Sequence, residues 1–112
     1  GTIEGVRLTT LDAFVDEQRL NRLDILILDV EGFEARALRG AGATLTRFRP
    51  LLLIELFPPV LAEQGATPES VAACLEPFGY RLFAAERDRL EPLHALPHGD
   101  QGLNVFAIPS EA

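Results

Sequence analysis

The chain has 112 residues, which matches the usual size of one compact domain and leaves no room for a second. Hydrophobic residues make up 47% of it and charged residues 24%, proportions that exclude a disordered tail, a collagen-like repeat and a disulfide scaffold. The formal charge of −7 predicts no binding to nucleic acids or to anionic membranes, because an acidic surface repels their phosphates.

Several residue types are scarce or missing. All ten basic residues are arginine, so there is no lysine for a Schiff base, a phosphate-binding loop or a kinase site. The chain has no methionine and opens at Gly1, which predicts a trimmed product. Cys74 is the single cysteine, which excludes an internal disulfide and favours a reducing, cytoplasmic compartment. No apolar stretch reaches the roughly 18 residues of a membrane span, and the N-terminus lacks a signal-peptide pattern.

The first half of the chain alternates between helical and strand patterns. Residues 2–8 fit a short strand or an irregular lead-in, and residues 10–20 fit a short helix that a threonine hydroxyl caps. Residues 24–30 are an apolar run without alternation, which predicts a strand that is buried on both faces. Residues 33–48 predict one helix whose buried face begins with Phe33 and whose polar residues, Glu34 among them, point away.

The second half continues the same alternation. Residues 50–57 predict a second buried strand, which Pro58 and Pro59 stop. A helix follows from Thr67 to Gly79, and residues 80–84 and 103–108 predict two strands around a polar loop. No helix separates these last two strands, so we expect them to pair antiparallel. The order predicts an α/β layered fold with a mostly parallel sheet.

Carboxylates stand at the ends of both buried strands. Asp29 and Glu31 flank Val30, so both would face one side while the strand continues, and Gly32 allows a sharp turn or a close ligand. Ligands of open α/β sheets bind beyond the carboxyl ends of strands, which makes these acids candidate functional groups. Alternatively, Glu31 and Glu34 only stabilise the positive end of the next helix, by about 0.3–1 kcal/mol.

Glu55 ends the second strand and has two interpretations as well. It is either a partly buried functional acid, or the point where the strand reaches the surface beside arginine partners at positions 47, 49 and 81. His94, His98 and Asp100 have a spacing that a metal site could use only on a helix, and the prolines and glycine around them predict a solvated loop instead. We therefore expect no metal site, and Cys74 lies on the apolar face of its helix as a core residue.

The segment from Asp24 to Glu34, with its Asp29-Val30-Glu31-Gly32 turn, resembles the FkbM family of S-adenosylmethionine-dependent methyltransferases. Further stretches fall in the order and spacing of that family, namely Thr10-Leu11-Asp12, Leu38-Arg39-Gly40-Ala41, Arg49-Pro50, Leu53-Ile54-Glu55, Phe78-Gly79-Tyr80 and Asn104-Val105-Phe106. One departure is Ile27, which stands where the family usually has lysine.

The resemblance implies a fold and an activity. The fold is a partial Rossmann-like class I methyltransferase sheet with flanking helices, in which these residues supply strands four to seven and the last strand is antiparallel. The single domain, residues 1–112, would be the C-terminal half of a methyltransferase domain, and the glycine-rich cofactor loop would lie before Gly1. The activity is O-methylation of a hydroxyl on a natural product or sugar, with S-adenosylmethionine as the methyl donor.

The resemblance also implies roles for four residues. Glu31 is the first candidate for the base or orienting group of the acceptor, and Asp29 and Glu55 complete the catalytic set. Asp29 and Gly32 would lie beside the cofactor. An alternative function is a non-catalytic α/β interaction module, which would self-associate as a homo-oligomer through the exposed edge of the strand at residues 24–30.

Overall fold

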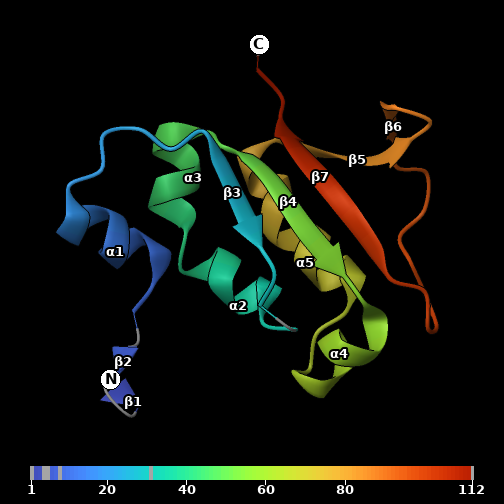
Figure 1. The fold of residues 1–112 in the computed structure, drawn as a ribbon, viewed down its shortest axis with the longest axis horizontal. Coiled ribbons are helices and arrows are strands. Elements are labelled where there is room, and N and C mark those ends of the chain that lie inside the picture. The colour runs from blue at the N-terminus through green and yellow to red at the C-terminus, as the bar shows by residue number, and fades with distance from the viewer. Residues whose placement is uncertain (1, 4–5, 8, 31, 112) are drawn as a thin grey trace.

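The computed structural model describes residues 2–3, 6–7, 9–30 and 32–111 (Figure 1). Two antiparallel strands of two residues each, β1 (Thr2–Ile3) and β2 (Val6–Arg7), precede the main sheet in the chain. The main sheet has five strands: β3 (Ile25–Leu28), β4 (Leu51–Leu56), β5 (Tyr80–Glu86), β6 (Arg89–Pro92) and β7 (Leu103–Pro109). The α-helices are α1 (Leu11–Gln18), α2 (Glu34–Arg39), α3 (Gly42–Phe48), α4 (Pro58–Glu63) and α5 (Pro68–Leu75), and a 3₁₀ turn at Glu76–Phe78 follows α5.

The strand order of the main sheet is β3-β4-β7-β5-β6. β3 and β4 are parallel, whereas β7 lies between β4 and β5 and is antiparallel to both. The expected antiparallel pairing of the last two predicted strands is therefore confirmed, and so is the α/β class. The expectation of a mostly parallel sheet is wrong, because the C-terminal strand inserts between β4 and β5 and keeps them apart.

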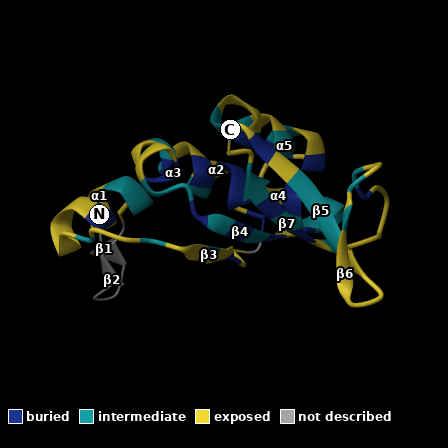
Figure 2. Ribbon diagram, turned by 90° about the horizontal axis from the view of Figure 1, so that it is seen from above, coloured by how far each residue is buried: buried dark blue, intermediate teal, exposed yellow. Residues whose placement is uncertain are grey.

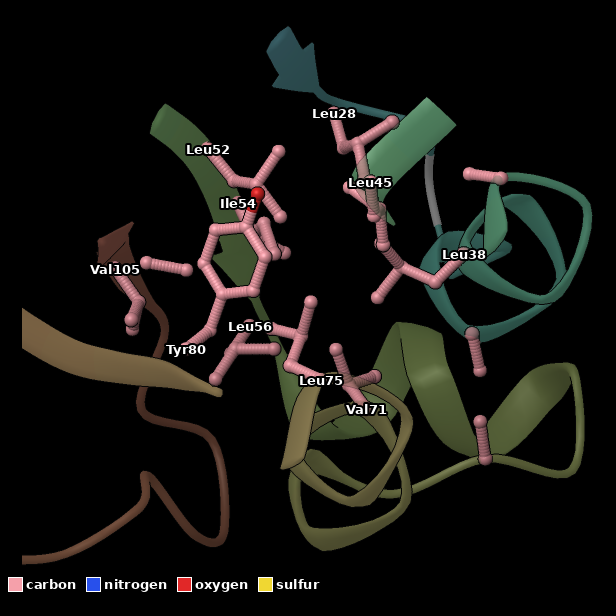
Figure 3. Close-up of a cluster of buried hydrophobic side chains, with 14 of the residues drawn as sticks. Leu28, Leu38, Leu45, Leu52, Ile54, Leu56, Val71, Leu75, Tyr80 and Val105 are labelled. Carbon is pink, nitrogen blue, oxygen red and sulfur yellow. The ribbon is translucent and has the colours of Figure 1, made fainter. Parts of the chain in front are cut away.

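Helices α2, α3 and α5 lie on one face of the sheet and enclose the core between themselves and the strands (Figure 2). Figure 3 shows how the core side chains from the two layers meet. The large aliphatic side chains that the solvent reaches least come from the sheet and from the helices: Leu38, Leu45, Leu52, Ile54, Leu56, Leu61, Val71, Leu75 and Val105. Burial of each such aliphatic side chain contributes about 1.5–3 kcal/mol, so this one interface carries most of the stability of the fold.

β3 is the edge strand of the sheet, and only one of its faces is buried. Leu28 is 8% exposed on the helical side, whereas Ile25 and Ile27 are 61% and 65% exposed on the other. The predicted burial on both faces is therefore wrong. The physical reason is that helices α2 and α3 pack against one face of β3, so alternate side chains of an apolar run still point into solvent.

The predicted helix over residues 33–48 is two helices. α2 ends at Arg39, and α3 starts at Gly42 after a turn at Gly40 and Ala41. Glycine near the middle of a helical pattern costs about 1 kcal/mol relative to alanine, and here the chain turns instead. Phe33, expected in the core, precedes α2 and is 39% exposed.

The ends of the other helices follow their local sequence. Thr10 caps α1, since its hydroxyl accepts a hydrogen bond from the Ala13 N–H at 3.1 Å. Thr67 and Ser70 form a reciprocal capping box at the start of α5. The two prolines after β4 do stop the strand, but they also begin α4, because proline is well accommodated in the first turn of a helix.

The Tyr80 side chain connects β5 to the residue before β4, and we expect its hydroxyl to have a raised pKa. Its hydroxyl donates to the Pro50 carbonyl at 2.6 Å. Burial raises the pKa of Tyr80 to about 12, an effect that Arg49 opposes and Glu111 reinforces. Because the folded pKa lies above the unfolded value of about 10, the stabilisation is complete below pH 10 and is lost as pH rises toward 12.

The chain has one tyrosine and no tryptophan, so absorbance of the tyrosinate reports this group alone. The native protein should show a midpoint near 12, and the protein in denaturant one near 10. Tyr80→Phe should remove the signal and lower the free energy of unfolding at pH 7 by about 1 kcal/mol. A native midpoint near 10 would contradict the buried hydrogen bond.

Candidate functional site

Three polar residues stand at one level across three neighbouring strands. Leu28 of β3 pairs with Ile54 of β4, so Asp29 and Glu55 follow at the same height. Glu55 in turn pairs with Asn104 of β7. All three are exposed, and the alternation of β4 places Glu55 on the sheet face opposite the helices. The sheet therefore brings together two of the predicted site residues, and it adds the Asn104 carboxamide.

Asn104 was missed as a site residue because its partner is distant in sequence. The register Glu55–Asn104 depends on β7 returning beside β4, which no local pattern encodes. The signal that was available is the single polar residue near the start of an otherwise apolar strand.

An apolar row adjoins the polar one on the same sheet face. Ile27, Leu53, Phe106 and Phe83 are register partners across four strands. Ile27 is exposed and the other three are half-buried. This face therefore presents hydrogen-bonding groups at the carboxyl ends of β3 and β4 and an apolar surface behind them.

Glu55 is exposed because it lies on the uncovered face of β4, and the strand continues to the buried Leu56. The arginines that could have paired with it are engaged elsewhere: Arg49 lies 3.1 Å from Glu111, Arg47 stacks on Phe48, and Arg81 stacks on Phe83. Within the described residues, no ion pair holds Glu55 in place. Its carboxylate is accessible to a ligand, as is that of Asp29.

The turn from β3 to α2 is held by Glu34. This side chain is 2% exposed, and its carboxylate accepts hydrogen bonds from the Val30 N–H at 3.2 Å and from the Gly32 N–H at 3.0 Å. The expectation that Glu34 points away from the core is therefore wrong. A carboxylate is the acceptor best suited to two converging N–H groups, so it closes the turn that follows Asp29.

Gly32 is required by packing against α4. Its φ is +96°, and a Cβ placed there would lie 2.5 Å from the Val60 carbonyl oxygen. The space that the missing side chain leaves is thus filled by this chain's own backbone. The backbone at Gly32 therefore leaves no room for a cofactor to lie against it. Asp29 is exposed, so it offers S-adenosylmethionine one carboxylate but does not enclose it. Glu31, the first candidate for the base, lies outside the described residues.

Asp12 joins α1 to the start of α3, a contact that no local sequence pattern predicts. Its carboxylate accepts from the Thr44 hydroxyl at 2.7 Å, the Thr44 N–H at 2.8 Å and the Ala43 N–H at 3.0 Å. α3 has no side-chain cap of its own, so Asp12 supplies this cap from 32 residues away. The contact fixes α1 next to the helix that follows the turn.

This contact predicts a stability that depends on pH. Partial burial of Asp12 alone would raise its pKa, but the hydrogen bonds from Thr44 and Ala43 outweigh this effect and lower the pKa below its usual value. The stabilisation is therefore present above about pH 4 and is lost as pH falls through the lowered pKa. Asp12→Ala should lower the free energy of unfolding at pH 7 by about 1–2 kcal/mol in urea titrations.

The control for Asp12 is Asp16→Ala on the same helix, where an exposed side chain should change stability by less than about 0.5 kcal/mol. The difference between Asp12→Ala and wild type should shrink as pH falls through the lowered pKa of Asp12, because the wild-type carboxylate then becomes protonated. A difference that stays constant with falling pH would mean that the ionised hydrogen bonds contribute nothing.

The loop histidines show no sign of a metal centre. His94 and His98 are exposed, and the described residues contain no group of three or more His, Cys, Asp or Glu side chains that could hold a metal ion. Cys74 is half-buried and packs against the core, as expected. None of the helices in the described ranges is long and apolar enough to cross a membrane.

Comparison with known protein families finds a match over most of the chain. The family model described as "Methyltransferase FkbM domain" matches residues 1–82, which are 82 of the 112 residues and include β3, the Asp29–Gly32 turn and β4. No curated protein and no solved structure matches the chain significantly. Since the family model covers well over half of the chain, the protein belongs to the FkbM methyltransferase family.

Proposed function

We propose that this chain carries the acceptor side of an S-adenosylmethionine-dependent O-methyltransferase site, whose substrate is a hydroxyl on a natural product or sugar. The match of the FkbM methyltransferase domain to residues 1–82 carries the proposal. The sheet supports it: β3, β4, β5 and β7 have the relations expected of strands four to seven of a class I methyltransferase, with the last strand antiparallel and inserted.

The proposed acceptor site is the polar row, which consists of Asp29 after β3, Glu55 of β4 and Asn104 near the start of β7. An acceptor hydroxyl needs a group to receive its proton and groups to hold it in line with the methyl donor. Asp29 and Glu55 are proton acceptors at one level of the sheet, and the Asn104 carboxamide can donate to a neighbouring oxygen of the acceptor. Glu31 belongs to the same proposed set.

S-Adenosylmethionine, when bound, supplies an electrophilic methyl group on a sulfonium. The exposed residues Asp29, Glu55 and Asn104 provide no enclosed place for it, and no Gly-x-Gly-x-x-Gly loop follows a strand within the 112 residues. We therefore assign to Asp29 a position beside the cofactor, and we propose that most cofactor contacts come from outside residues 1–112.

Calorimetric titration with S-adenosylmethionine and S-adenosylhomocysteine tests this division. A folded sample of the 112-residue chain should give no measurable binding. A dissociation constant in the micromolar range, about −8 kcal/mol, would show that the cofactor site is complete within these residues and would overturn the division.

Methyl transfer itself is tested in the protein that carries this chain. Transfer of labelled methyl groups to hydroxylated acceptors should fall about 10²-fold or more in Glu55→Gln, because a positioned proton acceptor contributes that much. Glu63→Gln is the matched control, since Glu63 is an exposed acid on α4 outside the polar row, and it should leave the rate unchanged. Equal rates in both variants would remove Glu55 from the proposed site.

A second candidate function is self-association through β3. The observation that favours it is an edge strand with two isoleucines that are 61% and 65% exposed. Edge strands with apolar, uncharged surfaces pair readily with another copy. Antiparallel pairing of two β3 strands about a twofold axis can place Ile25 of one copy opposite Ile27 of the other on the uncovered face.

Sedimentation equilibrium tests this candidate. The wild-type chain should form dimers, and Ile27→Lys should shift it to monomers, because lysine on an edge strand opposes pairing. Leu90→Lys is the control, since Leu90 is 41% exposed on β6, at the opposite edge of the sheet. A wild-type monomer at high concentration would argue against this function.

A further inference from the structure

A groove of about 550 Å³ lies between the start of α1, the helical side of β3, and α2. Its walls are mainly apolar: Leu11 from α1, Leu26 and Leu28 from β3, and Ala37 from α2. The volume falls within the range of about 300–1,000 Å³ that small-molecule sites occupy. The groove is separate from the polar row of Asp29, Glu55 and Asn104, because Leu26 and Leu28 face the opposite side of the sheet from Ile27 and Glu55.

Arg36 is the one charged side chain among the described residues that line this groove. It is exposed, and its guanidinium carbon lies 5.6 Å from the centroid of the Phe33 ring, which also lines the groove. In the described part of the chain, no carboxylate forms an ion pair with Arg36. This cation beside an apolar wall is complementary to an anion that also has an apolar body, although the chain as a whole is acidic.

We propose that this groove binds a small carboxylate with a flat apolar body. The body would pack on Leu26, Leu28 and Ala37, and the carboxylate would pair with the Arg36 guanidinium, whose planar fork matches a carboxylate. One guanidinium accommodates one carboxylate, so a monoanion fits better than a polyphosphate. The site does not depend on methyl transfer, and its test needs neither the cofactor nor an acceptor.

The probes are 2-naphthoate and its neutral amide, 2-naphthamide, which differ only in the carboxylate. Amide NMR spectra of the full chain, recorded at low ionic strength, locate each probe and give its affinity. Naphthoate should shift the amide signals of residues 9–11 and 36–41 and should bind about fivefold more tightly than naphthamide, the factor expected of one partly exposed charge-assisted contact. In Arg36→Gln, whose spectrum without ligand checks its fold, the two probes should bind equally.

Arg39→Gln is the matched control. Arg39 is an exposed arginine of the same helix that does not line the groove, so this variant should keep the fivefold preference. Ala37→Leu should weaken both probes, because the added side chain fills the groove at a site that is only half-buried.

Several results would overturn the proposal. Equal binding of the two probes to the wild-type chain would show that the carboxylate is not recognised. If Arg39→Gln also lost the tighter binding of naphthoate, the preference would come from the general attraction between arginines and an anion and not from the groove. Shifts centred on Ile25 and Ile27 would place the probes on the uncovered sheet face instead. Groove signals that move with protein concentration alone would show that a second copy of the chain occupies the groove.

Discussion

Replacing Gly32 with alanine should lower the free energy of unfolding by about 2–5 kcal/mol, the largest effect that we expect from a single methyl group in this chain. Two costs add. The backbone φ of +96° is strained for any residue with a Cβ, and that Cβ would meet the Val60 carbonyl oxygen at 2.5 Å. The carbonyl is part of α4 and cannot move away as a flexible side chain can, so the turn or the helix must shift.

Gly65→Ala separates these two costs. Gly65 also has a positive φ, +71°, but nothing lies within 4 Å of the position that a Cβ would take. This control should cost only about 1–2 kcal/mol, the strain of the left-handed conformation. Urea unfolding of both variants measures the difference. If Gly32→Ala were no more destabilising than Gly65→Ala, the packing of the turn against Val60 would be unimportant.

Glu34→Ala should cost about 2–4 kcal/mol, because it leaves two N–H groups of a buried turn without their acceptor. The carboxylate now accepts from Val30 and Gly32, and the side chain is 2% exposed. Loss of these two hydrogen bonds should also increase local opening of the backbone in the residues after β3. Amide hydrogen exchange at Val30 and Gly32 should therefore rise in the variant more than in the core of β4.

Glu69→Ala is the control that tests the simpler interpretation of Glu34. Glu69 is likewise an acid in the first turn of a helix, but it is exposed, so its loss should cost only the interaction with the helix dipole, about 0.3–1 kcal/mol. A similar small cost in Glu34→Ala would mean that Glu34, too, only stabilises the positive end of its helix.

The elements that the sequence predicted well are those with local signals. The Thr10 and Thr67 caps mark the starts of α1 and α5, and their hydroxyls bond to N–H groups three residues away. The apolar runs at residues 24–30 and 50–57 contain β3 and β4, since a run of branched and aliphatic residues between turn signals favours a strand. The break between α2 and α3 was not predicted, because the residues before α3 contain no side-chain cap. Asp12 provides this cap from a distant part of the chain.

The candidate site was predicted in part. Asp29 and Glu55 were recognised because each ends an apolar strand, and the parallel register of β3 and β4 places them at one level. Asn104 and Glu34 were not recognised as parts of the site or its support. The first joins the row through a strand pairing about 50 residues distant, and the second has the charge of a surface residue although it is buried.

The sequence by itself determined the α/β class and the order of most elements, because helix caps, apolar runs and turn residues act over a few positions. The family followed from the motif around Asp29-Val30-Glu31-Gly32 and from the family model that matches residues 1–82. Tertiary structure alone decided which face of β3 is buried, where β7 inserts and which N–H groups Asp12 and Glu34 cap. These features depend on contacts between distant segments. An exposed isoleucine and a buried glutamate contradict their own polarity, and only the packing of helices on one side of the sheet explains both.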